Sequence, residues 1–169
     1  VTENVISVKV NHQQPSSRWY SGSGIYRNVD LVVADPVHVA RYGTYVTTPD
    51  LEDEYAKGRA KVHVETKVEN ETESEAGVKV RTTILDDAGN VFCEAVTTEE
   101  IAVSAGETET FSQDIVTGKP ELWDTETPDL YSVKTEVIVE DKVVDTYDSS
   151  LGFRWVTMDP DEGFYLNGE

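Results

Sequence analysis

The most constraining feature of this sequence is a series of short runs in which apolar and polar residues alternate. In residues 60–69, Val62, Val64 and Val68 share one face, while the opposite face carries histidine, glutamate and lysine. Because successive side chains of an extended chain point to opposite sides, this pattern is typical of a strand with one buried face. The alternation recurs at residues 78–84 and 131–139. The chain is therefore expected to form sheets.

Turn residues separate these runs at intervals typical of a β-sandwich. Residues 86–90, Asp-Asp-Ala-Gly-Asn, have the composition of a hairpin connection, so residues 77–85 are expected to pair antiparallel with residues 91–98. Residues 52–58 are too polar for a core helix and are expected to be a connecting loop. Further strands are predicted at residues 37–47, 101–103, 108–116 and 143–151. We predict an all-β domain over residues 36–156, an immunoglobulin-like antiparallel β-sandwich of about seven strands.

Residues 1–35 have a different composition. Residues 17–29 gather aromatic and basic side chains around two glycines, which predicts a tight bend because glycine accepts backbone angles that a side chain would forbid. Alternation at residues 5–10 and 25–33 predicts two strands, yet a sheet this small is marginal in water. We therefore expect structure outside this chain to complete residues 1–35.

The charge balance limits the classes of partner. The chain has 14 Lys and Arg residues against 33 Asp and Glu residues, a formal net charge of −19. Phosphate backbones and anionic lipid headgroups are bound through cationic side chains, so we predict neither a nucleic-acid nor a membrane partner. The single cysteine, Cys93, excludes an internal disulfide and is expected to be a buried, unreactive thiol.

No catalytic constellation is recognised. The histidines His12, His38 and His63 lack the strained serine elbow of a Ser-His-Asp hydrolase, and His63, on the polar face of a strand, is interpreted as solvated. Adjacent carboxylates on a strand point to opposite faces and so cannot converge on one bond. Residues 159–163, Asp-Pro-Asp-Glu-Gly, offer carboxylates to calcium without the EF-hand pattern, and a charged turn between strands is favoured. We predict no catalytic residue, metal or cofactor here.

Three blocks of sequence stand apart from the alternating runs. They are residues 17–29, residues 120–131 (Pro-Glu-Leu-Trp-Asp-Thr-Glu-Thr-Pro-Asp-Leu-Tyr), and Leu-Gly-Phe-Arg at 151–154 followed by Gly-Phe-Tyr-Leu-Asn-Gly-Glu at 163–169. In this order they resemble glycoside hydrolase family 2, the family of β-galactosidases, β-glucuronidases and β-mannosidases. The first block resembles the end of that family's jelly-roll, sugar-binding domain, the second its middle sandwich domain, and the third the passage into its catalytic barrel.

The resemblance implies a retaining glycosidase, with β-galactosidase as the favoured activity, whose two catalytic glutamates lie on strands of a TIM barrel. Those strands would follow Glu169, so this chain is expected to contain neither glutamate and to be inactive alone. Residues 157–169 would lead into the barrel. The implied partners are the jelly-roll and TIM-barrel domains of the parent enzyme, its carbohydrate substrate and, through unpaired strand edges in residues 1–33, further copies of the chain.

Within such a parent, Ser17, Arg18 and Trp19 are the candidate substrate-proximal residues, because the family's first domain supplies residues at the rim of the barrel. These side chains could stack on and hydrogen-bond a sugar, and they could equally seal a domain interface. Trp123 and Tyr131 are expected to pack a loop against the next strand. The alternative hypothesis is a free-standing β-sandwich that binds carbohydrate or a protein.

Overall fold

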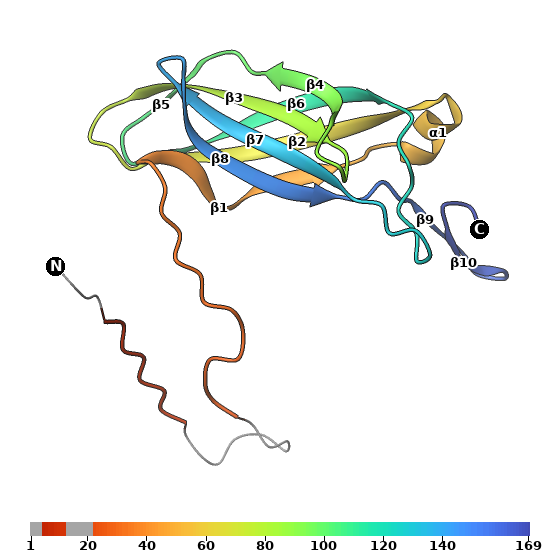
Figure 1. The fold of residues 1–169 in the computed structure, drawn as a ribbon, viewed down its shortest axis with the longest axis horizontal. Helices are drawn as coiled ribbons and strands as arrows, with labels where there is room; N and C mark the ends of the chain where they lie inside the picture. The colour runs from red at the N-terminus through yellow and green to blue at the C-terminus, as the bar shows by residue number, and fades with distance from the viewer. Residues whose placement is uncertain (1–4, 13–21) are drawn as a thin grey trace. The chain divides into compact units, whose positions relative to one another are not determined.

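The computed structural model describes residues 5–12 and 22–169, and it divides the chain into two compact units, Val1–Val33 and Ala34–Glu169. The described residues of the first unit form no helix or strand (Figure 1). The strands expected at residues 5–10 and 25–33 are therefore wrong as predictions. Ile6 and Leu31, for example, are 85% and 86% exposed. An alternating run becomes a strand only where a neighbour completes its backbone hydrogen bonds and covers its apolar face.

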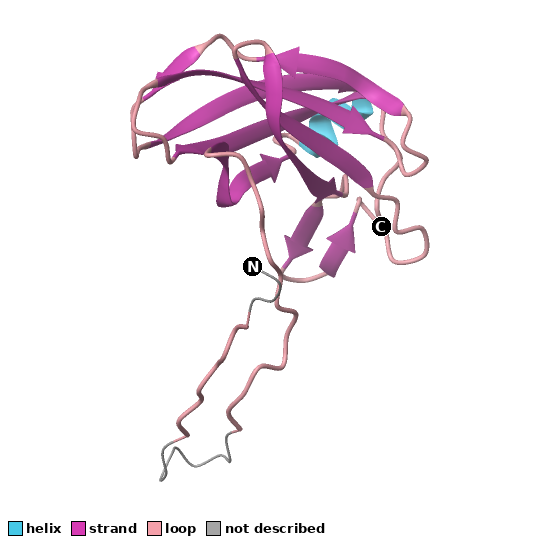
Figure 2. Ribbon diagram, turned by 60° about the vertical axis from the view of Figure 1, so that its left-hand side comes forward, coloured by secondary structure: helices cyan, strands magenta, loops and turns pink. Residues whose placement is uncertain are grey.

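The second unit contains two antiparallel sheets that pack into a sandwich (Figures 1 and 2). The three-stranded sheet has the order β1-β2-β6, and the five-stranded sheet has the order β4-β3-β7-β8 with β5 paired to β3. Their bounds are β1 (Val37–Thr47), β2 (Arg59–Asn70), β3 (Ala76–Leu85), β4 (Val91–Thr97), β5 (Ile101–Val103), β6 (Thr108–Gly118), β7 (Tyr131–Val139) and β8 (Lys142–Leu151). The immunoglobulin-like antiparallel sandwich is confirmed, as is the pairing of β3 with β4.

The inward faces form two hydrophobic clusters separated by a polar belt. One cluster includes Val62, Ile84, Val133 and Phe153, and the other includes Val68, Val80, Phe111 and Val137. The polar belt consists of Thr66, Thr82, Gln113 and Thr135, all buried. The Thr82 hydroxyl donates to Gln113 Oε1 at 2.7 Å, whereas the hydroxyls of Thr66 and Thr135 have no hydrogen-bond partner within the described structure. The polar belt therefore contributes less to the stability of the sandwich than the valines on either side of it.

Side chains close the two seams where the edges of the sheets meet. At one seam, Asp145 Oδ2 of β8 accepts a hydrogen bond from the backbone N–H of Val39 in β1 at 2.9 Å. At the other seam, Gln113 Nε2 of β6 donates to the carbonyl of Val96 in β4 at 2.8 Å. Free backbone groups on edge strands invite pairing with other chains, and each of these contacts satisfies one such group.

Residues 52–58, expected to be a loop, include a short helix, α1 (Leu51–Ala56), between β1 and β2. That expectation is wrong because α1 is too short to show helical periodicity, and its stability comes from tertiary contacts. Leu51 and Glu54, three residues apart, are the buried members of the helix. Within the described residues, no helix has the length and apolar character needed to cross a bilayer.

A separate antiparallel hairpin, β9 (Val156–Asp159) and β10 (Gly163–Leu166), follows β8 at the end of the sandwich that also carries α1 (Figure 1). In its turn, Asp159 Oδ1 accepts hydrogen bonds from the backbone N–H groups of Asp161 and Glu162 at 2.8 and 2.9 Å. These bonds lower the pKa of Asp159. Residues 159–163 therefore form the expected charged turn between strands.

Candidate functional site

Two blocks that lie far apart in the sequence meet at one end of the sandwich. Residues 120–131 connect β6 to β7, and residues 151–169 run from the end of β8 through the hairpin. The backbone N–H of Trp123 donates to the carbonyl of Phe153 at 2.9 Å, which joins the two blocks directly. We define the junction as Trp123, Gly152, Arg154, Trp155 and Asn167.

The Trp123 ring is held from two sides. A Cβ atom added to Gly152 would lie 3.1 Å from Trp123 Cβ and 3.2 Å from its Cγ, so the tryptophan packs directly on the glycine backbone. The Arg154 guanidinium carbon lies 4.4 Å from the centroid of the Trp123 ring, a cation–π contact. Both neighbours come from the linker between β8 and β9, so this linker fixes the connection from β6 to β7.

An aromatic cluster supports the junction from inside the sandwich. Phe153 is fully buried, and its ring centroid lies 5.1 Å from that of Tyr131 in an edge-to-face arrangement. Phe92 packs on Tyr131 with a centroid separation of 4.7 Å. The Tyr131 hydroxyl accepts the backbone N–H of Glu121 at 3.0 Å, and burial raises its pKa. The expected packing of this loop against the next strand is confirmed.

Asn167 joins the hairpin to the junction. Its Oδ1 accepts the backbone N–H of Trp155 at 3.1 Å, and its Nδ2 donates to the carbonyl of Trp123 at 3.0 Å. Its own backbone N–H donates to the Trp155 carbonyl at 3.0 Å. The backbone of Asn167 is left-handed, with φ of 56°, a conformation that asparagine tolerates better than most residues. We call this set of bonds the Asn167 clamp.

The helix α1 packs beside the clamp. The ring centroids of Tyr55 and Trp155 are 5.7 Å apart, and Lys119 Nζ lies 4.2 Å from the Tyr55 centroid. The linker before β9, the helix and the residue after β6 thus contact one another through two aromatic rings and a cation. The indole N–H of Trp155 is buried and has no hydrogen-bond partner among the described atoms.

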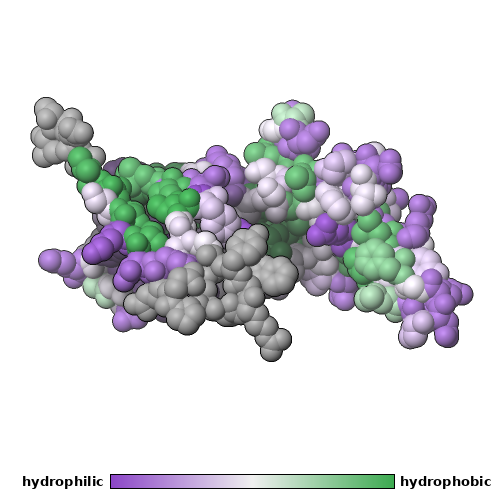
Figure 3. Space-filling view, turned by 90° about the horizontal axis from the view of Figure 1, so that it is seen from below, coloured by the Kyte–Doolittle hydropathy of each residue, from purple (hydrophilic) through white to green (hydrophobic). Residues whose placement is uncertain are grey.

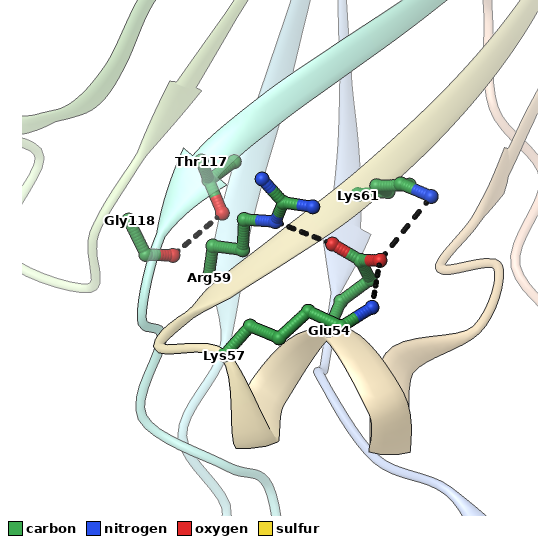
Figure 4. Close-up of polar contacts among 6 residues, drawn as sticks. All are labelled: Glu54, Lys57, Arg59, Lys61, Thr117 and Gly118. Carbon is green, nitrogen blue, oxygen red and sulfur yellow. Dashed lines mark hydrogen bonds and ion pairs between the residues drawn. The ribbon is translucent and has the colours of Figure 1, made fainter.

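A buried carboxylate attaches α1 to β2 (Figure 4). Glu54 is 3% exposed and forms ion pairs with Lys57 at 3.0 Å, with Lys61 at 3.3 Å and with Arg59. The bonds from Arg59 and then Lys57 lower the pKa of Glu54 to about 2, against the effect of burial. The cluster keeps Glu54 ionised, and its contacts hold the helix in place; they leave no free base for catalysis.

One face of the hairpin is apolar and exposed. Met158 lies opposite Phe164 and Val156 opposite Leu166, so these side chains share one face. Val156 is 52% exposed, Met158 77% and Phe164 59%. We call Val156, Met158 and Phe164 the apolar hairpin face. Figure 3 shows green, hydrophobic surface at the right-hand end of the molecule, where Figure 1 places β9 and β10. Apolar surface of this kind is typical of contacts between domains.

Ser17, Arg18 and Trp19 lie outside the described residues, so their proximity to substrate stays a prediction. His63 faces outward on β2, with Nδ1 2.7 Å from Asp114 Oδ1, and this contact raises the pKa of the imidazole. No group of three or more His, Cys, Asp or Glu side chains is placed to hold a metal ion in the part of the chain that the structure describes.

The role of Asn167 was not predicted from the sequence. The available signal was an Asn-Gly pair following an alternating run, which is typical of a left-handed turn.

Comparison with known proteins identifies the family of the chain. Residues 37–154 match the family described as Glycosyl hydrolases family 2. The chain belongs to glycosyl hydrolase family 2. The β-galactosidase BoGH2A of Bacteroides ovatus is 38% identical over 166 residues, which cover 98% of this chain and 19% of that protein. A β-glucuronidase of Formosa agariphila is 31% identical over 188 residues, which cover 99% and 19% respectively.

Solved structures of glycosidases share the fold. A β-glucuronidase of family 2 superposes with a TM-score of 0.72 at 30% identity, covering 80% of this chain and 14% of that one. A β-glycosidase from Bacteroides vulgatus gives 0.70 at 26% identity, covering 90% and 18%. The chain therefore spans about a fifth of the length of these curated family 2 relatives.

Proposed function

We propose that this chain is a non-catalytic scaffold domain of a family 2 glycosidase, which holds neighbouring domains of the parent enzyme at a fixed angle. One observation carries the proposal: 98% of the chain aligns with only 19% of a β-galactosidase. The junction supports it, because its contacts tie connections to one another and offer no nucleophile paired with a base. Scaffolding is the role that such a site can perform.

The parent enzyme, in this proposal, hydrolyses terminal glycosides with retention of configuration, using two glutamates on strands of a TIM barrel outside this chain. The relatives include a β-galactosidase and a β-glucuronidase, so the sugar at the cleaved bond is proposed as a galactoside or a glucuronide. Sequence resemblance favours the galactoside. The residues that distinguish these substrates belong, in this proposal, to the barrel and its loops.

The two ends of the chain contact different domains in this proposal. Residues 1–35 complete the jelly-roll domain, which explains the exposed apolar side chains of the described residues there. Residues 36–156 form the sandwich, and residues 157–169 lead into the barrel, which covers the apolar hairpin face. Burying that face would remove exposed apolar surface from water. The partners are therefore the jelly-roll and the barrel, with carbohydrate as substrate of the whole enzyme.

The proposal is tested by activity. The isolated chain should not hydrolyse nitrophenyl β-galactoside or β-glucuronide, whereas the full-length parent should hydrolyse one of them. Activity of the isolated chain that survives repurification contradicts the scaffold role. In the parent, Ser17→Ala, Arg18→Ala and Trp19→Ala test substrate proximity: each should raise KM and leave the melting temperature close to that of the wild type. A lowered melting temperature with an unchanged KM would assign these residues to a domain interface.

Two further measurements separate the alternatives. Calorimetric titration of the isolated chain with oligosaccharides should show no saturable binding; binding that Trp19→Ala abolishes would favour a free-standing carbohydrate-binding module. Self-association through unpaired backbone groups of residues 1–33 stays a prediction. Small-angle scattering that shows only a monomer over a range of concentrations would contradict it.

A further inference from the structure

We propose that Asn167 is a positioning residue whose side-chain amide fixes the hairpin β9–β10, and with it the apolar hairpin face, on the end of the sandwich. The functional meaning of this inference rests on the proposed scaffold role. Its structural content concerns this chain alone, so the two can be tested separately.

One amide group joins three segments of the chain. Trp123 belongs to the connection from β6 to β7, Trp155 to the linker before β9, and Asn167 follows β10. The amide accepts from the Trp155 backbone through Oδ1 and donates to the Trp123 backbone through Nδ2. Both partners are backbone groups, so substitution of the tryptophan side chains does not remove the bonds. Asn167 therefore determines where the hairpin lies relative to both connections.

The chemistry of the clamp selects asparagine. It needs one acceptor and one donor on the same short side chain, and asparagine provides both. Aspartate would keep the acceptor for Trp155 but would place a carboxylate oxygen against the carbonyl oxygen of Trp123. Glycine would accept the backbone φ of 56° but would lack the amide. These two replacements consequently separate the amide's role from that of the backbone.

The hairpin depends on this attachment because it is small. Each strand has four residues, and an isolated two-stranded hairpin is marginal in water. Its apolar face is largely exposed, so burial of this face adds little to its stability in this chain. Other contacts near the attachment include the Tyr55–Trp155 ring pair, the Asn167 backbone bond to Trp155 and the packing of Trp155 against the core. Loss of the amide should thus free the hairpin locally while the sandwich stays folded.

Hydrogen exchange of the isolated chain tests the clamp directly. In Asn167→Gly and Asn167→Asp, the amides of Trp155 and of the hairpin should exchange at least about tenfold faster than in the wild type, with unchanged exchange in β2, β6 and β7. Glu162→Ala is the matched control, since it removes the bond from Tyr165 to Glu162 inside the hairpin and touches no junction residue. Hairpin exchange in Asn167→Gly that equals the wild type overturns the proposal.

A second test needs no variant. Asn167-Gly168 is the one Asn-Gly pair in the sequence. In a flexible chain the Gly168 backbone nitrogen attacks Asn167 Cγ, a C–N bond forms, the side-chain nitrogen leaves as ammonia, and water opens the imide to aspartate or isoaspartate. Hydrogen bonds at both ends of the amide restrain this attack. At mildly alkaline pH, the folded chain should deamidate at Asn167 at least about tenfold more slowly than the chain in urea, as measured by peptide mass mapping. Equal rates overturn the clamp.

The turnover of the full-length parent enzyme tests whether the clamp serves the scaffold role. Asn167→Gly should lower the turnover of a nitrophenyl glycoside, whereas Glu162→Ala should leave it unchanged. Fast hairpin exchange in the isolated variant together with undiminished turnover in the parent would support the clamp and contradict the scaffold role. Slow hairpin exchange in the isolated variant would overturn the clamp whatever the parent's activity.

Discussion

The two ends of the sandwich each centre on an asparagine, and they use it differently. At the end where β1 begins, Asn70 is fully buried and bonds only to groups of its own end: Nδ2 donates to the carbonyls of Ser74 and Val103 at 2.8 and 2.9 Å. Its Oδ1 accepts the Thr72 hydroxyl at 2.7 Å. At the other end, Asn167 reaches from the hairpin to two separate connections.

This difference separates two tasks that loops of a sandwich can perform. The Asn70 side chain bonds only to groups of its own end, as a loop residue does when it serves folding. The Asn167 end leaves three large apolar side chains of the hairpin exposed, which is costly unless another surface covers them. Asn70 thus joins groups within one end, whereas Asn167 joins the hairpin to two separate connections. The following predictions test this contrast, beginning with the largest expected effect.

Asn70→Ala should destabilise the whole sandwich by about 2–4 kcal/mol, because it removes several buried hydrogen bonds and leaves their partners unsatisfied. Urea denaturation followed by circular dichroism measures this. Asn90→Ala is the control: it removes an exposed bond to Asp86 in the β3–β4 turn. Equal losses for the two variants would show that Asn70 does not organise its end.

Gly152→Ala should destabilise the junction by about 1–3 kcal/mol, because the added Cβ would meet Trp123 at 3.1 Å. The emission of Trp123 and Trp155 should shift before the circular dichroism of the sandwich changes on heating. Gly118→Ala, where an added Cβ meets nothing within 4 Å, is the matched control. A single transition that reports both signals together would argue that the junction and the sandwich unfold as one.

Acidification should weaken the ion pairs of Glu54 that attach α1 to β2, at the same end of the sandwich as Asn167. The pKa of Glu54 is about 2 in the folded chain against 4.5 for the ordinary group, so Glu54 stabilises the fold fully above about pH 4.5 and loses this contribution as pH falls toward 2. The stability difference between wild type and Glu54→Gln should therefore shrink over this range. Glu52→Gln, on the same helix, controls for the lost charge. A difference that stays constant from pH 6 to about 2.5 would contradict the linkage.

The polar belt between the two ends should give the smallest effect. Thr135→Val replaces a buried hydroxyl that has no partner in the described structure with a methyl of similar size, and should stabilise the chain by about 1 kcal/mol or less. Thr82→Val should instead destabilise it by about 1 kcal/mol, because Gln113 Oε1 loses its donor. Opposite signs in chemical denaturation would confirm the distinction, and a destabilised Thr135→Val would indicate an unrecognised partner.

The strands of the sandwich could be predicted because the alternating pattern that specifies each strand lies within that strand. Val62, Val64, Thr66 and Val68 are buried at alternate positions of β2, as are Val133, Thr135 and Val137 in β7, and a two-residue period needs no knowledge of other strands. The two strands expected before Ala34 failed for a complementary reason: their pattern was right, but no neighbour is present to pair with them among the described residues. Helix α1 escaped prediction because six residues contain too few turns to show a period.

The junction could be predicted only in part. Residues 120–131 and 151–169 were identified by resemblance, and the Trp123 and Tyr131 loop packs as expected. Their mutual contact was not visible, since Asn167 and Trp123 are 44 positions apart and neither residue type specifies the other. The partners of Glu54 lie close to it in sequence, but Arg59 and Lys61 reach it only when β2 packs against the helix.

The closed seams of the sandwich have a practical consequence for protein engineering. Asp145 and Gln113 each bind one backbone group across the gap between the sheets, so a side chain ties the two sheets together at both seams. Residues 34–155 should therefore tolerate transplantation into an unrelated fusion protein as a stiff spacer. In a tandem array of such domains, each added copy should increase the length of the array by the same amount.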